Sequence, residues 1–247
     1  MTEEHQSGNS ESRNLYCNTP TAQSICDLVS FCRETKSMGL IVGNPGVGKT
    51  TALNHFANTF YEARICSMSP AHSSMSGALA KLCTALESYP ARSIREMHEV
   101  ICNALTWSRE IDVLMFDEAQ HLTNQSLEEL RCIHDQTDTA MVFSGNATFQ
   151  NRFNKAKGAV FAQFTSRVSM RLELWEPTSD DILAFCRHHE ITGDKEFEFL
   201  SKHAKSNGGL RTVSKLINVA GPLAGKGKSI SLNHLKAATG MLLGVGQ

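Results

Sequence analysis

The segment Gly43–Thr50 reads Gly-Asn-Pro-Gly-Val-Gly-Lys-Thr and fits the spacing G-x-x-x-x-G-K-[ST] at every fixed position. Glycines let main-chain N–H groups turn inward around phosphate oxygens, and the helix that follows adds the positive end of its dipole. Lys49 supplies positive charge for the β- and γ-phosphates, and the Thr50 hydroxyl is a ligand for Mg²⁺. The sequence therefore predicts a nucleotide-binding loop whose contacts come from Asn44, Pro45, Gly46, Val47, Gly48, Lys49, Thr50 and Thr51.

A second motif, Val113–Glu118, is an apolar run that ends in two acidic residues. Parallel sheets place ligands at the carboxyl ends of their strands, so we expect Asp117 to hold Mg²⁺, directly or through water. The next carboxylate, Glu118, is placed to polarise an attacking water as general base. Together with the loop, this motif indicates a nucleoside triphosphate hydrolase rather than a nucleotide kinase.

Three further residues complete the predicted catalytic set. Asn146 follows the predicted strand Ala140–Ser144, and its amide is suited to orienting the lytic water near the γ-phosphate. Arg167 and Arg211 are candidates to place a rigid cationic fork on the side of the γ-phosphate opposite the loop. Because such an arginine acts in trans from a neighbouring subunit, the sequence predicts a homo-oligomer. Arg171 competes with Arg167 for this role, and the spacing alone leaves the choice open.

Apolar periodicity predicts the elements that position these residues. The predicted strands are Gly39–Val42, Arg64–Met68, Ile111–Phe116, Ala140–Ser144 and Val168–Leu174. The helices between them are Thr21–Lys36, with Thr21 as its cap, Thr50–Phe60, Met75–Leu86, Ile94–Trp107 and Leu127–Gln136. This alternation predicts an α/β fold with a parallel sheet and helices on both faces.

The pattern changes after Pro177, where four helices follow without an intervening strand. They are predicted at Asp180–His189, Lys195–Ser206, Leu210–Ala220 and Leu232–Leu243. We therefore divide the chain into a disordered polar tail (residues 1–14), an α/β domain (15–176) and a small helical domain (177–247).

Composition narrows the class of protein. Hydrophobic residues make up 41% and charged residues 20% of the 247 residues, as in ordinary globular proteins. The polar, acidic N-terminus is unlike a signal peptide, and apolar runs stay short of a membrane span, so we expect a cytoplasmic protein without a membrane partner. The eight cysteines include no CxxC pair, which favours reduced, buried thiols over a metal or redox site.

Taken together, these residues resemble the AAA+ ATPases, and among them the target-selecting ATPases of DNA transposition of the phage Mu B type. The resemblance runs from about Tyr16 to near the C-terminus. It rests on GLIVGNPGVGKT, VLMFDEAQHL followed by LEELRCIHD, FSGN, FAQFTSR and GGLR. It implies an AAA+ P-loop NTPase fold with a C-terminal helical lid. It also equates Asn146 with sensor 1, Arg167 with the arginine finger and Arg211 with sensor 2.

The same resemblance implies a function. In that family, ATP drives assembly into helical filaments or rings on double-stranded DNA. The filament recruits a transposase, which stimulates hydrolysis and disassembly. The Mu B type carries an additional N-terminal helix-turn-helix domain, whereas about 20 residues precede the AAA+ core here, so we expect that domain to be lacking.

Two other branches share the motif set, namely the general secretion ATPases of the ExeA type, which act on protein partners, and helicase-loader-like ATPases. Asn146 fits the transposition branch better than the secretion branch, which tends to have Gln there. The lack of a membrane span also disfavours secretion.

The formal net charge of −1 hides an uneven distribution. The last 48 residues carry +7 without any acidic residue, which leaves −8 on the first 199. A second stretch, residues 139–172, holds five basic residues and no acid, and such asymmetry suits phosphate contacts with DNA. In AAA+ proteins the loops that reach a central substrate correspond to Asn151–Gly158 and Ser69–Ser76. We predict DNA contacts from Arg152, Lys155 and Lys157, although a solvated helix face explains any single lysine equally well.

Overall fold

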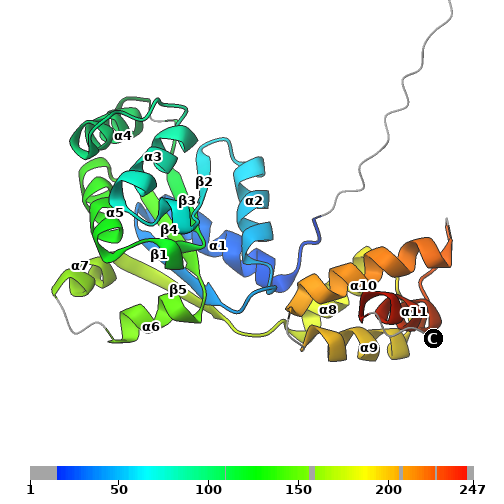
Figure 1. Ribbon diagram of the computed structural model, residues 1–247. Helices are drawn as coiled ribbons and strands as arrows, with labels where there is room; N and C mark the ends of the chain where they lie inside the picture. The colour runs from blue at the N-terminus through cyan, green and yellow to red at the C-terminus, as the bar shows by residue number, and fades with distance from the viewer. Residues whose placement is uncertain (1–15, 109, 156–158, 206–207, 226, 244–247) are drawn as a thin grey trace, which may run out of the picture.

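The computed structural model describes residues 16–108, 110–155, 159–205, 208–225 and 227–243 (Figure 1). Within these residues, five parallel strands form one sheet in the order β2-β3-β4-β1-β5. The strands are β1 (Met38–Gly43), β2 (Ala63–Ser67), β3 (Val113–Asp117), β4 (Ala140–Gly145) and β5 (Val168–Leu174). All five strands predicted from the sequence are confirmed, each end within two residues.

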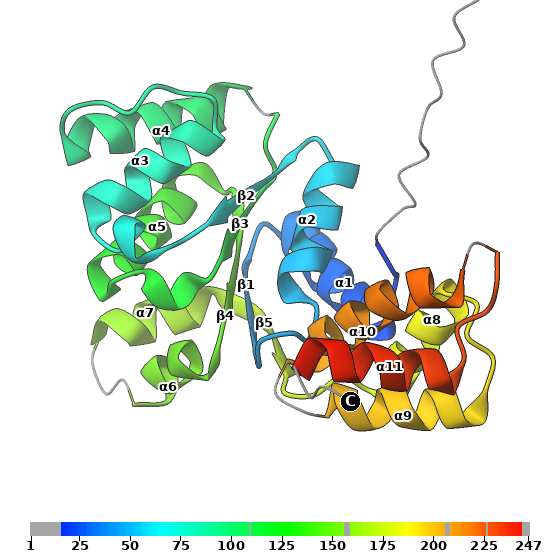
Figure 2. The same ribbon diagram turned by 45° about the vertical axis from the view of Figure 1, so that its right-hand side comes forward.

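Helices cover both faces of this sheet (Figure 2). The helices α1 (Pro20–Thr35) and α2 (Lys49–Thr59) pack on one face. The other face is covered by α3 (Met75–Ala85), α4 (Ile94–Ser108), α5 (Asn124–Thr137), α6 (Ala147–Lys155) and α7 (Ala159–Arg167), with the short 3-10 helices η1 (Pro70–His72) and η2 (Ala119–His121) in the connections. The strands β1, β3 and β4 are buried along their whole length, which explains their near-continuous apolar sequences.

Successive strand residues point to opposite faces of the sheet. Met115 and Val142 face α1 and α2, whereas Phe116 and Phe143 belong to the core under α3–α7. The rings of Phe116 and Phe143 stack with centroids 5.0 Å apart, which fixes the register of β3 against β4.

The start of α1 differs from the prediction that Thr21 is its cap. Thr19 is the cap, and its side chain accepts a hydrogen bond from the N–H of Ala22, while Pro20 occupies the first helical turn. Thr21 lies inside the helix and is buried, and its hydroxyl is used elsewhere.

The stretch after β4 also differs, because residues 151–155 end helix α6 instead of belonging to a loop. The side-chain oxygen of Asn146 accepts hydrogen bonds from the N–H groups of Thr148 and Phe149, which starts the helix. Phe149 is fully buried and packs edge-on against Phe153 one helical turn later, so α6 turns an apolar face into the core. Neither α6 nor α7 was predicted.

The helices after Pro177 form a layer of their own with a separate core (Figure 2). They are α8 (Ser179–His188), α9 (Asp194–Ala204), α10 (Gly209–Ala224) and α11 (Leu232–Leu243), and all four were predicted. No helix within the described residues has the length and apolar character that a membrane span needs.

Candidate nucleotide-binding site

The loop between β1 and α2 has the backbone geometry that its glycines predict. Gly46 and Gly48 adopt left-handed conformations, with φ of 85° and 102°, a region that residues with a Cβ rarely enter. Lys49 is the first residue of α2, and its Nζ donates hydrogen bonds to the carbonyl oxygens of Gly43 (2.8 Å) and Asn44 (2.9 Å). The ammonium group thus lies across the mouth of the loop.

The charges around Lys49 favour the binding of an anion. Burial lowers the pKa of its ammonium group, Asp117 and Glu118 oppose that effect, and Arg211 adds to it. Two cationic side chains, Lys49 and Arg211, therefore share this end of the sheet. A negatively charged phosphate between them offsets the cost of holding both charges.

Asp117 ends β3 beside the start of α2 and is almost completely buried. Its Oδ2 accepts a 2.6 Å hydrogen bond from the hydroxyl of Thr50, and its Oδ1 accepts a 2.8 Å bond from the hydroxyl of Ser144 on β4. A carboxylate next to a threonine hydroxyl is the oxygen donor set that Mg²⁺ takes beside nucleotide phosphates. The residues present thus fit this cation.

Glu118 follows directly and has a left-handed backbone conformation with φ of 54°. This bend separates its side chain from that of Asp117 and turns the chain into η2. The Glu118 carboxylate accepts a hydrogen bond from Nε2 of Gln120. Asp117, predicted to bind the metal, is bonded to Thr50 and Ser144, whereas Glu118, predicted to act as the base, is bonded to Gln120. The separate partners are compatible with separate roles.

Asn146 follows β4 at the same edge of the sheet. Because its side-chain oxygen caps α6, the orientation of its amide is fixed by the helix that follows. The sequence placed Asn146 near the lytic water, and that role stays a prediction.

The helical domain reaches this site through the N-terminus of α10. The N–H of Leu210 donates a 2.8 Å hydrogen bond to the carbonyl oxygen of Gly46. The approach is so close that a Cβ added at Gly46 would lie 1.9 Å from the carbonyl oxygen of Gly208. Arg211 is the next residue after Leu210, so this contact between main chains brings Arg211 towards Lys49.

The structure places Arg167 far from this site. Arg167 ends α7 just before β5, and β5 pairs in parallel with β1 from Met38 onward. The nucleotide-binding loop lies at the opposite end of β1, six residues or roughly 20 Å away at about 3.3 Å per residue. The Arg167 Nε lies 2.8 Å from Oδ1 of Asp135 on α5. Arg171 lies within β5 and pairs with Glu173 at 3.1 Å.

The predicted DNA contacts lie on and after α6. The Arg152 guanidinium donates hydrogen bonds to the carbonyl oxygen of Leu122 (2.6 Å) and to Oδ1 of Asn124 (2.5 Å). Lys155 is the last residue of α6, and Lys157 lies outside the described residues.

The remaining residues of the predicted loop have varied roles. The N–H of Asn44 donates to the carbonyl oxygen of Leu174 (2.9 Å), and its Nδ2 donates to that of Trp175 (2.5 Å), so Asn44 attaches the loop to the end of β5. Val47 is buried, whereas Thr51 is exposed.

Sequence reasoning missed Ser144 and Gln120 at this site, Asp135 beside Arg167, and Asp181 at the start of the helical domain. Ser144 is signalled by being the one hydroxyl in the apolar run Ala140–Gly145. Asp181 is signalled by the spacing Thr178-x-x-Asp181, which forms a capping box at the start of α8.

Asp181 also joins the helical domain to α1. It is fully buried, and its carboxylate accepts hydrogen bonds from the N–H (2.8 Å) and the hydroxyl (2.7 Å) of Thr21. The same carboxylate accepts from the N–H of Thr178 at 2.8 Å. Residues 160 positions apart are thereby connected.

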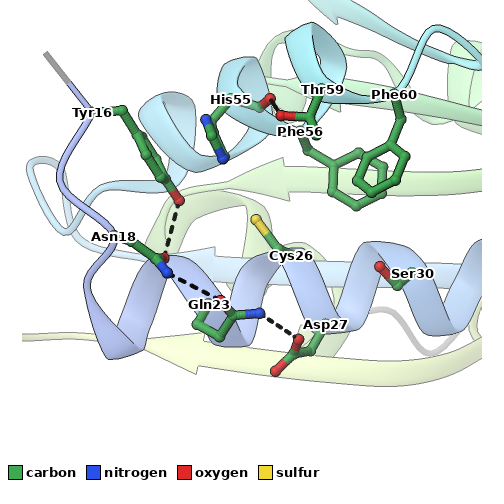
Figure 3. Close-up of a pocket in the computed structure, with 10 residues that line it drawn as sticks. All are labelled: Tyr16, Asn18, Gln23, Cys26, Asp27, Ser30, His55, Phe56, Thr59 and Phe60. Atoms are coloured by element: carbon green, nitrogen blue, oxygen red, sulfur yellow. Dashed lines mark hydrogen bonds between the residues drawn. The ribbon is translucent and has the colours of Figure 1, made fainter. Parts of the chain in front are cut away.

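A cavity of about 200 Å³ lies between α1 and α2 (Figure 3). The stacked rings of Tyr16 and His55 lie at one side of it, and Thr59 and Phe60 lie at the far end of α2. None of the residues that line it belongs to the predicted nucleotide site. The cavity is therefore separate from that site.

Similarity to solved structures agrees with this architecture. The chain resembles the Cdc6p protein of Pyrobaculum aerophilum, with a TM-score of 0.66 at 15% identity over 92% of this chain and 68% of that one. It also resembles the ORC2 protein of Aeropyrum pernix, with a TM-score of 0.63 at 14% identity over 89% of this chain and 66% of that one. Residues 32–153 match the family described as AAA domain. With the loop, the strand carboxylates and the helical lid, the protein is an AAA+ P-loop ATPase.

The helical part identifies the branch. Residues 166–242 match the family described as Mu B transposition protein, C terminal. The ATP-dependent target DNA activator B proteins of Escherichia phages D108 and Mu are each 28% identical over 226 residues, 90% of this chain and 72% of theirs. The Mu-like prophage FluMu DNA transposition protein B of Haemophilus influenzae is 25% identical over 81% of this chain and 70% of its own. The chain is a homologue of the Mu B transposition proteins, as its motifs predicted.

Proposed function

We propose that this protein assembles with ATP on double-stranded DNA and delivers the bound DNA as a target to a transposase. The observation that carries the proposal is the match to the target DNA activator B proteins over 90% of the chain. This match includes both the nucleotide site and the helical domain. The relatives' names describe an ATP-dependent action on target DNA, which is the activity proposed here.

The geometry supports a specific division of labour in hydrolysis. Thr50 and Asp117 would hold Mg²⁺, which would supply positive charge against the nucleotide phosphates. Lys49 binds the β- and γ-phosphates. Glu118 accepts a proton from the water that attacks the γ-phosphorus, while the bond from that phosphorus to the ADP oxygen breaks. Asn146 orients this water, and Arg211 contacts the phosphates from the lid.

The position of Arg167 supports the assembly of several subunits. At roughly 20 Å from its own nucleotide-binding loop along β1, it cannot contact the γ-phosphate bound there. We propose that it instead contacts the γ-phosphate of a neighbouring subunit, where its fork stabilises the transition-state charge. Arg171 pairs with Glu173 and Arg167 pairs with Asp135, so these ion pairs do not decide between the two arginines. ATP thereby couples neighbouring subunits, and hydrolysis releases them.

The distribution of charge supports contact with DNA. The last 48 residues carry +7 without an acidic residue, and residues 139–172 are also free of acids. Phosphate contacts from Arg152, Lys155 and Lys157 remain part of the proposal, with Arg152 giving up its bonds to Leu122 and Asn124 when it reaches a phosphate. Binding of this kind weakens steeply with salt.

The test is electron microscopy and light scattering of the protein with ATP, with duplex DNA and with both. We expect ordered assemblies in the presence of ATP and DNA, disassembly as ATP is consumed, and an ATPase rate that rises with duplex DNA and with transposase. Assembly and ATPase rate that are both indifferent to duplex DNA contradict the proposal and favour a scaffold acting on protein partners. A preference for single-stranded DNA points to helicase loading instead.

A further inference from the structure

Ser144 lies beside Asp117 because of the register between β3 and β4. The pair Phe116 and Phe143 is directly opposed across these parallel strands, and both side chains face the core under α3–α7. Asp117 and Ser144 each come one residue later, so their side chains emerge on the other face, where α2 begins. The sheet itself thus sets the serine hydroxyl against the carboxylate.

The hydrogen bonds of Asp117 are unambiguous in direction. Its ionised carboxylate only accepts, so the hydroxyls of Ser144 and Thr50 both donate to it. Ser144 is fully buried and Asp117 nearly so, which means that water does not replace a lost partner easily. Bonds to an ionised acceptor are among the stronger ones in proteins.

The two carboxylate oxygens therefore have separate tasks. Ser144 holds Oδ1 from the side of β4, which leaves Oδ2 facing Thr50 at the start of α2. Donation by the Thr50 hydroxyl to Asp117 leaves the lone pairs of its oxygen available to a cation. Without Ser144, Oδ1 has lost its donor in a dry site, and the carboxylate gains by rotating away from Thr50 to find another.

We propose that Ser144 is a positioning residue for the divalent cation that accompanies the nucleotide. It acts through Asp117, fixing the plane of that carboxylate so that Oδ2 and the Thr50 hydroxyl face the cation together. The proposal rests on the assignment of Mg²⁺ to Thr50 and Asp117 made above. The segment at the end of β4 then has two roles: Ser144 positions the cation site, and Asn146 orients the water.

Calorimetry of ADP binding to the full chain, with Mg²⁺ and with EDTA, tests the proposal without requiring hydrolysis. Wild-type protein is expected to bind ADP more tightly with Mg²⁺. In Ser144→Ala, the increase in ADP affinity caused by Mg²⁺ should be about tenfold smaller, the equivalent of one charged hydrogen bond. The ADP affinity in EDTA should be unchanged. Ser144→Cys, with a similar shape and a weaker donor, should fall between the two.

The matched control is Ser126→Ala. Ser126 is also buried and donates to a main-chain carbonyl, that of Ser73, without touching Asp117. The thermal stability of Ser126→Ala should fall as in Ser144→Ala. The increase in its ADP affinity caused by Mg²⁺ should be unchanged. A full Mg²⁺ gain in Ser144→Ala overturns the role of Ser144 alone. A wild-type protein without any Mg²⁺ gain overturns the cation assignment of Thr50 and Asp117 as well.

Discussion

The N–H of Leu210 in the helical domain donates a 2.8 Å hydrogen bond to the carbonyl oxygen of Gly46 in the nucleotide-binding loop. The contact joins main chain to main chain, so it depends on the absence of side chains at Gly46 and Gly209 rather than on any charged group. It makes the position of the helical domain sensitive to the shape of the loop, and it carries Arg211 with it. We therefore expect nucleotide binding and lid position to be coupled through this bond.

Gly46→Ala should break the contact between the nucleotide-binding loop and the N-terminus of α10. The added Cβ would lie 1.9 Å from the carbonyl oxygen of Gly208, and alanine is strained at φ of 85°. We expect ATP affinity, measured by calorimetry, to fall at least about tenfold as Arg211 is displaced. Gly221→Ala is the control, because nothing lies within 4 Å of its Cβ in helix α10 and alanine favours helix. Unchanged affinity in Gly46→Ala would show that the contact is dispensable.

Glu118→Gln should keep nucleotide binding and stop hydrolysis. The amide has the shape of the carboxylate but does not accept the proton of the attacking water, so the ATPase rate should fall by about 100-fold or more. Assemblies on DNA should then persist after the time in which wild-type protein disassembles, as followed by light scattering. Lys49→Ala is the contrasting variant, in which nucleotide binding itself is expected to be lost. Turnover near the wild-type rate in Glu118→Gln would exclude it as general base.

Arg167→Ala should reveal whether the arginine acts between subunits. We expect a low ATPase rate with intact ATP binding, because the distant nucleotide-binding loop of the same chain is untouched. Mixing Arg167→Ala with Glu118→Gln should restore activity, since one mixed interface combines the intact arginine of one chain with the intact glutamate of the other. Arg171→Ala is the control and should lower the rate little. Absence of restoration in the mixture argues against action in trans.

Asp181→Asn should destabilise the junction between the helical domain and α1. An amide NH₂ then faces the N–H groups of Thr21 or Thr178, leaving buried donors without an acceptor. We expect the free energy of unfolding in urea to fall by about 2–3 kcal/mol. Asp180→Asn changes the neighbouring exposed aspartate and should be nearly neutral. Equal effects of the two substitutions would refute the role of the buried carboxylate.

The buried cysteines predict a dependence on pH. Burial raises the pKa of Cys66 to about 12 and that of Cys32 to about 11, so both stay protonated and unreactive at pH 8. Alkylation followed by mass spectrometry should modify them only after unfolding. In α5, Cys132 is half-buried, and Arg131 partly opposes the rise of its pKa, so it should react first.

The sign of the stability effect follows from the same shifts. Because these thiols bind their protons more tightly in the folded state, their contribution to stability is complete below pH 9 and declines as the unfolded thiols ionise above it. Urea unfolding at pH 8 and pH 10 measures this loss. Rapid labelling of Cys66 in the folded protein would contradict its burial.

Local patterns were sufficient for much of the fold. The strands β1, β3 and β4 are apolar runs of strand length, and the nucleotide-binding loop follows a spacing that few other structures share. The helices α6 and α7 were missed; they are joined by the contact of Phe153 in α6 with Phe164 in α7, two segments that no local pattern connects. Thr21 was mistaken for a cap because its true partner, Asp181, is 160 residues away.

The sequence by itself determined the nucleotide chemistry, because Lys49, Thr50 and Asp117 belong to motifs whose spacing is fixed by the turn or strand that carries them. The tertiary structure alone decided which groups support them. Ser144 meets Asp117 only through the pairing of β3 with β4, and Leu210 meets Gly46 only when the helical domain packs against the loop. The place of Arg167 at the far end of β1 likewise follows from strand order. Such contacts depend on register and docking between distant segments, which local residue patterns do not specify.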